Sequence, residues 1–128
     1  MHKDIPSVLL IDDDDELASF VSATLVERGY SVTRLASGWN ALEVIQQGTF
    51  DLLITDIVMP EKNGLELITE LRKAGVDLPI LAMSGAAESA LYLRMARHLG
   101  AIGVLFKPFR TDELIASLQR LLKTQQAA

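Results

Sequence analysis

The stretch Phe50-Asp-Leu-Leu-Ile-Thr-Asp-Ile-Val-Met-Pro60 decides the fold of this chain. It contains a short apolar run, residues 52–55, that ends in a single carboxylate, Asp56. A continuous run of this length is typical of a strand buried on both faces of a sheet, and Pro60 cannot continue its hydrogen-bond ladder. We therefore expect Asp56 at the C-terminal end of a central strand, the edge where open parallel α/β sheets bind ligands. From this strand alone, Asp56 could equally be a turn residue or a helix cap.

Length and composition set limits on the class of protein. A chain of 128 residues is about one domain, and its 49% hydrophobic residues can form a buried core. Twelve basic against seventeen acidic residues give a net charge of −5, which argues against direct nucleic-acid binding through phosphate contacts. The lack of cysteine argues against disulfides and thiolate zinc sites. No apolar stretch reaches the ~18 residues of a membrane span and the N-terminus lacks the apolar segment of a signal peptide, so we expect a soluble, cytoplasmic protein with no membrane association.

Apolar runs and helical periodicities alternate along the whole chain. This alternation predicts an α/β fold, in which a five-stranded parallel sheet is covered by helices on both faces. Ser37 and Thr111 are expected to cap the second and the last helix. Leu91, Met95 and Leu99 recur at helical spacing in the fourth helix. The expected strands are residues 8–11, 30–35, 52–56, 79–84 and 102–106, each followed by a helix, the fourth of them over 87–99.

Polar side chains gather where the expected strands end. If the sheet is doubly wound, the C-terminal ends of its first, third, fourth and fifth strands converge on one rim. The residues at those ends are Asp12 and Asp13, Asp56, Ser84 and Lys107. Singly, each has an ordinary explanation: Ser84 could be a turn hydroxyl and Lys107 a solvated charge, just as Asp14 and Asp15 could cap the first helix. Together the rim residues predict a pocket with three carboxylates, one hydroxyl and one ammonium group.

Such a pocket predicts a cation site and phosphoryl chemistry. Three carboxylates within a few ångströms repel one another by roughly 1 to 4 kcal/mol per pair, so they favour a bound cation. Oxygen ligands without histidine or cysteine suit Mg²⁺. Lys107 then offers positive charge to an anion that arrives beside the metal. A carboxylate surrounded by a hydroxyl, a lysine and Mg²⁺ is suited to attack phosphorus and form an aspartyl phosphate.

The motifs that carry these residues resemble those of a known family. They are Val8-Leu-Leu-Ile-Asp-Asp13, Leu53-Ile-Thr-Asp56 with Met59-Pro60, Met83-Ser84-Gly85 and Phe106-Lys-Pro-Phe109. Their order and spacing resemble the receiver domain of bacterial two-component response regulators, over about residues 6–123. The resemblance implies one receiver domain over residues 1–128, with the flavodoxin-like strand order 2-1-3-4-5. It also implies a signalling phosphoprotein of a phosphorelay rather than an enzyme.

The resemblance assigns a role to each acidic residue of the pocket. Asp56 is expected to accept a phosphoryl group from the phosphohistidine of a sensor histidine kinase or a histidine phosphotransfer protein. Mg²⁺ is expected to bind Asp13, Asp56 and the backbone carbonyl of Val58, while Asp12 acts mostly through a metal-bound water.

The resemblance also implies a switch. Ser84 and Lys107 are expected to bind phosphate oxygens, and the Lys107–Pro108 peptide bond is expected to be cis. Phosphorylation is expected to switch a signalling face over residues 84–109, which binds a downstream protein of unknown identity. Candidates for the exposed part of that face are Tyr92, Arg94, Arg97 and His98.

The sequence departs from the family pattern in two places. Family members usually carry Tyr or Phe three residues before the lysine, where this chain has Val104, and we expect Phe106 to face the other side of the strand. The switch should then rest on Ser84 and the helix that follows it.

Val58 and Ala86 lack hydrogen-bonding side chains that could orient an attacking water, so loss of the phosphoryl group is expected to be slow. In addition, the chain carries no output domain, as expected of either a single-domain regulator or a fragment.

Three other functions remain open at this stage. A haloacid-dehalogenase-like phosphatase would need an acid two residues after the nucleophile, where this chain has Val58. A flavodoxin-type cofactor binder would need a phosphate-binding loop after the first strand, where aspartates 12–15 would repel phosphate. A receiver-shaped binding module that is never phosphorylated would not need the complete pocket, and only a phosphorylation assay separates it from a working receiver.

Overall fold

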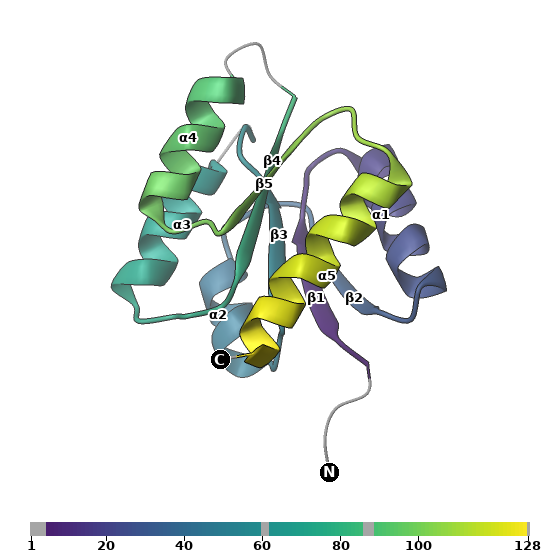
Figure 1. The fold of residues 1–128 in the computed structure, drawn as a ribbon. Helices are drawn as coiled ribbons and strands as arrows, with labels where there is room; N and C mark the ends of the chain where they lie inside the picture. The colour runs from purple at the N-terminus through teal and green to yellow at the C-terminus, as the bar shows by residue number, and fades with distance from the viewer. Residues whose placement is uncertain (1–4, 60–61, 86–88, 128) are drawn as a thin grey trace.

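The computed structural model describes residues 5–59, 62–85 and 89–127. In these residues five parallel strands form one sheet in the order β2-β1-β3-β4-β5, and helices alternate with them along the chain (Figure 1). The α/β class and the flavodoxin-like strand order predicted from the sequence are confirmed. The strands are β1 Ser7–Ile11, β2 Ser31–Leu35, β3 Leu52–Asp56, β4 Ile80–Ser84 and β5 Gly103–Phe106, and the helices are α1 Asp15–Glu27, α2 Ala41–Gln47, α3 Gly64–Lys73, α4 Ser89–Leu99 and α5 Thr111–Ala127.

The central strand β3 is buried along its whole length, which explains its apolar sequence. Leu53 pairs with Leu9 of β1 on one side and with Ile80 of β4 on the other. The edge strand β2 instead consists of exposed and half-buried residues. Since all five strands are parallel, their C-terminal ends meet at one edge of the sheet, and Asp56 lies in the middle of that edge.

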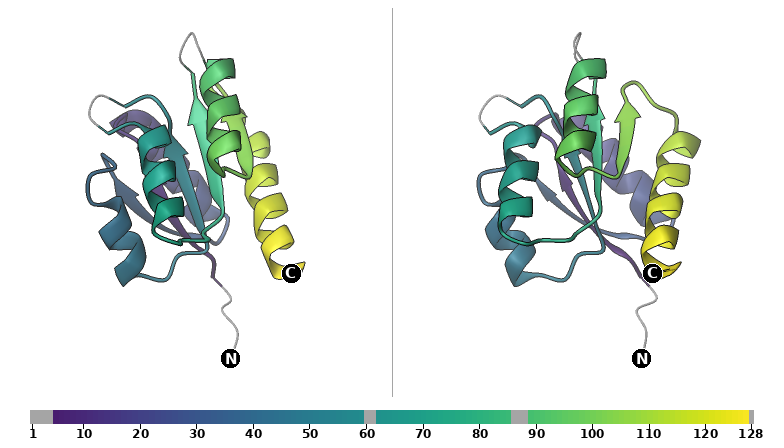
Figure 2. Two further views of the ribbon diagram at one scale, coloured as in Figure 1. Left: turned by 90° about the vertical axis from the view of Figure 1, so that its left-hand side faces the viewer. Right: turned by 60° about the vertical axis from the view of Figure 1, so that its left-hand side comes forward.

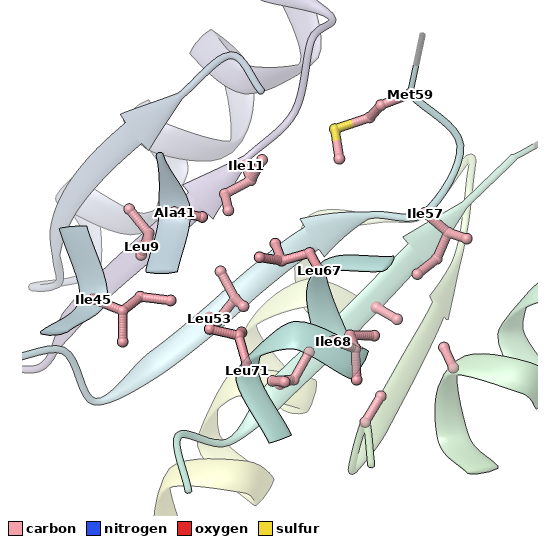
Figure 3. Packing of buried hydrophobic residues seen from close by; sticks show 14 of the residues in the cluster. Leu9, Ile11, Ala41, Ile45, Leu53, Ile57, Met59, Leu67, Ile68 and Leu71 are labelled. Atoms are coloured by element: carbon pink, nitrogen blue, oxygen red, sulfur yellow. The ribbon is translucent and has the colours of Figure 1, made fainter. Parts of the chain in front are cut away.

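Helices cover both faces of the sheet (Figures 1 and 2). The helices α2, α3 and α4 lie on one face, and α1 and α5 lie on the other. Successive side chains of β3 pack alternately into the two layers, because the side chains of a strand alternate between the two faces of the sheet. The first layer packs Leu9, Ile11 and Leu53 of the sheet against Ala41, Ile45, Leu67, Ile68 and Leu71 of the helices (Figure 3). The second packs Val8, Leu10, Leu52 and Ile54 against Val21, Leu25, Leu114 and Leu118.

The helix α4 does not pack against the sheet with the stripe of residues that its sequence spacing predicts. Leu91 and Met95 are 49% and 42% exposed, whereas Leu93 and Ala96 are buried. Two apolar stripes overlap in this helix, and the stripe that contains Leu93 and Ala96 makes the contact with the sheet. The stripe that begins at Leu91 therefore lies on the surface, apart from Leu99, which packs partly against the core.

The side of β5 that Phe106 faces was also predicted wrongly. Val104 and Phe106 are two residues apart in one strand, so they point to the same face. Both line a hollow beside α4, together with Leu93 and Arg97. Phe106 is the last residue of β5 and is 52% exposed.

Two helix starts differ from the predicted caps. Asn40 precedes α2, and the hydroxyl of Ser37 accepts a hydrogen bond from the Trp39 backbone N–H instead of capping the helix. Thr111 is the first residue of α5, and the side chain of Glu113 accepts a hydrogen bond from the backbone N–H of Arg110. In the described part of the chain, no helix has the length and apolar character needed to cross a membrane.

Candidate functional site

Three carboxylates converge at the C-terminal edge of the sheet. Asp12 and Asp13 follow β1, and Asp56 is the last residue of β3. One oxygen of each carboxylate lies within 4.8 Å of the others. Asp12 is fully buried and Asp56 is 6% exposed, while Asp13 is exposed to solvent. The acidic residues named from the sequence thus share one site, and one of them is open to solvent.

The segment between β1 and α1 holds Asp12 by its backbone and its side chain. The backbone N–H of Asp12 donates to the carbonyl of Leu35 at 3.1 Å, which extends the β1–β2 ladder by one residue. Its Oδ1 accepts a hydrogen bond from the Asp14 N–H at 3.0 Å. The Asp14 side chain in turn accepts from the N–H of Leu17 at 3.1 Å and caps α1, as the sequence predicted. The start of α1 therefore fixes the direction of the Asp12 carboxylate.

Lys107 reaches into the acidic cluster from the end of β5. Its Nζ lies 3.1 Å from Asp56 Oδ2 and 3.4 Å from Asp12 Oδ2. The backbone N–H of Lys107 donates to the carbonyl of Ser84 at 3.0 Å, and the Lys107–Pro108 peptide bond is cis, as the resemblance implied. A Cβ at Gly85 would lie 2.9 Å from the Lys107 Cβ, so a side chain there would press on the lysine. The ammonium group is thus held against two carboxylates.

The Asp56 carboxyl group is in an environment that disfavours its charge. Burial raises its pKa above the ordinary value, and the nearby Asp12 carboxylate raises it further. The positive charge and hydrogen bond of Lys107, and the backbone N–H of Ile57, lower it again. Burial is the largest of these effects, so the pKa of Asp56 remains raised. A cation beside Asp56 would relieve this cost.

The donor set fits Mg²⁺. All three candidate side-chain ligands offer carboxylate oxygens, which hard divalent cations prefer. The Lys107 ammonium group contacts the carboxylates of Asp12 and Asp56, so one positive charge faces a cluster of three carboxylates. The exposed position of Asp13 leaves one side of the cluster open to solvent, which suits a metal that keeps several water ligands.

Ser84 ends the strand next to that of Asp56, and Val58 follows Asp56 by two residues. Ser84 is the last residue of β4, is fully buried and stands opposite Phe106 of β5. Val58 is 45% exposed and lines the mouth of the site. Two further residues that the sequence analysis used, Pro60 and Ala86, lie outside the described residues.

Apolar side chains that the sequence analysis did not assign to the site form one wall of it. A hollow of about 570 Å³ beside Asp56 is lined by Leu17 and Phe20 of α1 and by Pro108 and Phe109 after β5. Phe20 is 46% exposed. Its place one turn after the acidic segment is the signal that could have assigned it to the site.

Gly64 shapes the segment between Asp56 and α3. Its N–H donates to the carbonyl of Ile57 at 2.8 Å. A Cβ at this position would lie 2.5 Å from the carbonyl oxygen of Asp56 and 2.9 Å from the Ile57 Cα. Only glycine fits so close to the backbone of the site. The sequence gives no signal for this contact.

Known proteins are similar to this chain over most of its length. The family model of the response regulator receiver domain matches residues 8–119. Transcriptional regulatory protein DltR of Streptococcus agalactiae is 34% identical over 122 residues, which are 94% of this chain and 53% of DltR. The chain thus spans about half the length of DltR. Response regulator receiver protein CpdR of Brucella abortus is 36% identical over 115 residues, which are 90% of this chain and 95% of CpdR.

Solved structures show the same architecture. Chemotaxis protein CheY4 of Vibrio cholerae is 33% identical, covers 91% of this chain over 98% of its own, and superposes with a TM-score of 0.83. Family match, sequence identity and strand order agree with the acidic site at the C-terminal edge of the sheet. The chain therefore belongs to the response regulator receiver domains, the phosphoacceptor modules of two-component signalling.

Proposed function

We propose that Asp56 is the phosphoacceptor of this receiver and that Mg²⁺ is required for its phosphorylation. The observation that supports this most directly is the cluster of Asp12, Asp13 and Asp56 with Lys107 Nζ 3.1 Å from the Asp56 carboxylate. Of the three clustered acids, Asp56 is the one that both ends the central strand of the sheet and lines the hollow beside it.

In the proposed reaction a carboxylate oxygen of Asp56 attacks the phosphorus of a phosphohistidine. The new O–P bond forms while the P–N bond breaks, and the electron pair of that bond leaves with the donor's imidazole, which accepts a proton. Lys107 is placed to bind a phosphoryl oxygen and to offset the negative charge that arrives. Mg²⁺, held by Asp13, Asp56 and the Val58 carbonyl with Asp12 one water away, would supply positive charge to the phosphoryl oxygens.

The apolar wall beside Asp56 suits the surface of a phosphodonor. Leu17, Phe20 and Phe109 line the hollow in which Asp56 lies. An exposed aromatic ring beside a reactive group is a typical anchor for a protein partner. We assign this wall to the docking of a sensor histidine kinase or a histidine phosphotransfer protein, whose imidazole must reach the recessed carboxylate.

We expect the conformational change that follows phosphorylation to be transmitted through β4, β5 and α4. In this proposal Ser84 and Lys107 respond to the phosphoryl group, and the hydrogen bond from the Lys107 N–H to the Ser84 carbonyl supports their coupling. A shift of Ser84 would be transmitted to Phe106, its neighbour across the sheet. The hollow beside Val104 gives Phe106 room to respond, because a large ring does not fill that position.

A downstream protein would meet an apolar surface with basic groups on α4 and β5. Leu91, Met95 and Phe106 are about half exposed. Arg94 and Arg97 line the hollow between this helix and β5 and are exposed. His98 is exposed too, whereas Tyr92 is half-buried and packs against the core. The apolar and basic groups together favour a partner with apolar anchors and acidic neighbours.

Phosphorylation can be tested directly by intact mass. The protein is incubated with acetyl phosphate, with and without Mg²⁺, and with a purified histidine phosphotransfer protein as a second donor. We expect one added phosphoryl group, only with Mg²⁺, and none in Asp56→Asn. Asp77→Asn is a matched control, because Asp77 is an exposed acid before β4, at the opposite edge of the sheet. Labelling of Asp56→Asn at another residue would contradict the assignment.

A further inference from the structure

Arg34, the fourth residue of β2, contacts both the backbone and a side chain of the acidic residues 12–15 that follow β1. Its Nε and one terminal nitrogen donate to the backbone carbonyl of Asp12, at 3.1 and 2.7 Å. The same terminal nitrogen lies 2.9 Å from the carboxylate of Asp15, the first residue of α1. One guanidinium group therefore joins the edge strand to both ends of the segment between β1 and α1.

Register places Arg34 where it can do this. It pairs with Leu10 of β1, whose side chain belongs to the layer under α1 and α5. The arginine therefore lies on the α1 side of the sheet, and its side chain runs to the start of that helix. Its side chain is 28% exposed, so it is partly shielded from water, whereas Asp15 is 87% exposed.

With Arg34 included, every polar group of Asp12 has a partner. Its N–H donates to the Leu35 carbonyl, its carbonyl accepts from Arg34, and its two carboxylate oxygens face the Asp14 N–H and Lys107 Nζ. A fully buried residue with all its polar groups bonded cannot rotate without losing several of them. The carbonyl contact comes from outside the β1–α1 segment, so the segment by itself cannot replace it.

We infer that Arg34 is a positioning residue for the cation site, an inference that rests on the proposed function. The carboxylates of Asp12, Asp13 and Asp56 repel one another in the absence of a cation, so their convergence needs support from the surrounding structure. Arg34 supplies it through the backbone of Asp12 and thereby holds the ligands near the geometry that Mg²⁺ requires.

The direction in which Mg²⁺ affinity changes when Arg34 is removed distinguishes a positioning role from a purely electrostatic one. A positive charge near a cation site weakens cation binding, so removal of Arg34 would tighten Mg²⁺ binding if charge alone mattered. If Arg34 positions the segment, its removal weakens Mg²⁺ binding despite the loss of a like charge. Lysine keeps the charge but not the planar fork that donates twice to one carbonyl, so Arg34→Lys should restore only part of the affinity.

The test is a calorimetric titration of the unphosphorylated full chain with Mg²⁺ at fixed ionic strength. We expect Arg34→Gln to raise the Mg²⁺ dissociation constant about tenfold, the lower end of the range for groups that orient metal ligands. Arg34→Lys should fall between this variant and wild type. Asp15→Asn keeps the contact with the Asp12 carbonyl and should change the constant less than about threefold. Arg28→Gln removes the same charge at the far end of α1 and should bind like wild type.

The outcomes are distinguishable. Equal or tighter Mg²⁺ binding by Arg34→Gln, with wild type binding normally, overturns the positioning role and leaves the proposed function intact. Absence of Mg²⁺ binding in wild type overturns both. Thermal unfolding of each variant without metal shows whether the fold is kept. If Arg34→Gln does not fold, the comparison of Arg34→Lys with wild type decides, and unchanged affinity there counts against the inference.

Discussion

Asp56 carries a negative charge in a buried position beside a second carboxylate. Its pKa is raised by burial, so the folded state holds a proton at this group more readily than the unfolded state does. As pH rises from the ordinary carboxyl pKa through the raised pKa, the unfolded state releases its proton first, and the free energy of unfolding falls. The loss is complete above the raised pKa. The proposed phosphoacceptor therefore destabilises the metal-free fold.

We expect Asp56→Asn to raise the free energy of unfolding of the metal-free protein at pH 7 by roughly 1 kcal/mol, about 4 °C in the unfolding midpoint. Asparagine cannot ionise, so the gain should shrink as the pH is lowered toward the ordinary carboxyl pKa. Thermal unfolding followed by circular dichroism between about pH 4 and pH 8 measures it, with Asp77→Asn as control. A lower midpoint for Asp56→Asn at pH 7 would show that the attraction of Lys107 outweighs burial.

Val58 places an apolar side chain at the mouth of the site, where it is 45% exposed. A polar side chain there could orient a water for attack on an aspartyl phosphate. We expect Val58→Asn to shorten the half-life of phosphorylated Asp56 about threefold to tenfold, below the roughly hundredfold effect of a full general base. Val58→Ala, which removes bulk without adding a polar group, is the matched control. Phosphate release is followed after removal of the donor, and equal rates for wild type and Val58→Asn would exclude this role.

Among the elements, α3 begins unusually close to the site. Alanine is favoured over glycine inside a helix by roughly 1 kcal/mol, so helix propensity alone predicts that Gly64→Ala stabilises the protein. The contact of an added Cβ with the Asp56 carbonyl, 2.5 Å away, predicts the opposite. We expect the contact to dominate and to cost about 1–3 kcal/mol, as overpacking usually does.

Denaturant unfolding of Gly64→Ala tests this, with Gly38→Ala as control, because a Cβ at Gly38 would meet its nearest neighbour at an ordinary 3.6 Å. Mg²⁺ binding of Gly64→Ala should weaken as well, since the carbonyl it displaces belongs to Asp56. A stabilised Gly64→Ala variant with normal Mg²⁺ affinity would show that the segment adapts freely.

The helix α4 presents leucine on opposite sides within one turn. Leu93 is 2% exposed and packs against the sheet, whereas Leu91 is 49% exposed. Leu93→Ala should therefore lower the free energy of unfolding by about 2–5 kcal/mol, the usual range for a buried leucine. Leu91→Ala should change it by less than about 0.5 kcal/mol. Denaturant unfolding of the two variants compares the faces directly, and a larger loss at Leu91 would reverse the orientation described for α4.

At the scale of the whole molecule, a ligand bound at the site would stabilise the folded state. Asp12 and Asp13 follow β1 and Asp56 ends β3, so a cation bound among these three carboxylates stabilises only the folded sheet. At a free concentration of one hundred times its dissociation constant, such a ligand adds about 2.7 kcal/mol to the free energy of unfolding.

We expect Mg²⁺ to raise the unfolding midpoint of wild type at pH 7, and a chelator to reverse the rise. Asp13→Asn should lose most of the effect, because it removes a proposed ligand that is exposed and whose loss spares the core. Sodium chloride at equal ionic strength controls for screening of the net charge of −5. An equal rise with sodium chloride would mean that screening, and not a bound ion, stabilises the protein.

The sequence by itself determined the fold class and the members of the acidic site. Short apolar runs such as residues 52–55 can be buried on both faces only in a covered parallel sheet, and alternating helices supply the covers. Parallel strands then bring their C-terminal ends to one edge, so Asp12, Asp13, Asp56 and Lys107 were predictable as neighbours. These inferences depend on local periodicity and chain direction, which the sequence records.

Tertiary structure decided what depends on contacts between distant segments. Periodicity could not choose between the two overlapping apolar stripes of α4, because docking on the sheet selects Leu93 over Leu91. It could not show that Gly64 touches the Asp56 backbone, or that Arg34 binds the carbonyl of Asp12 across the sheet. The raised pKa of Asp56 likewise arises from burial and from charges brought close by folding. Each of these features is a distance between residues far apart in the chain, and a distance of that kind exists only once the elements have packed.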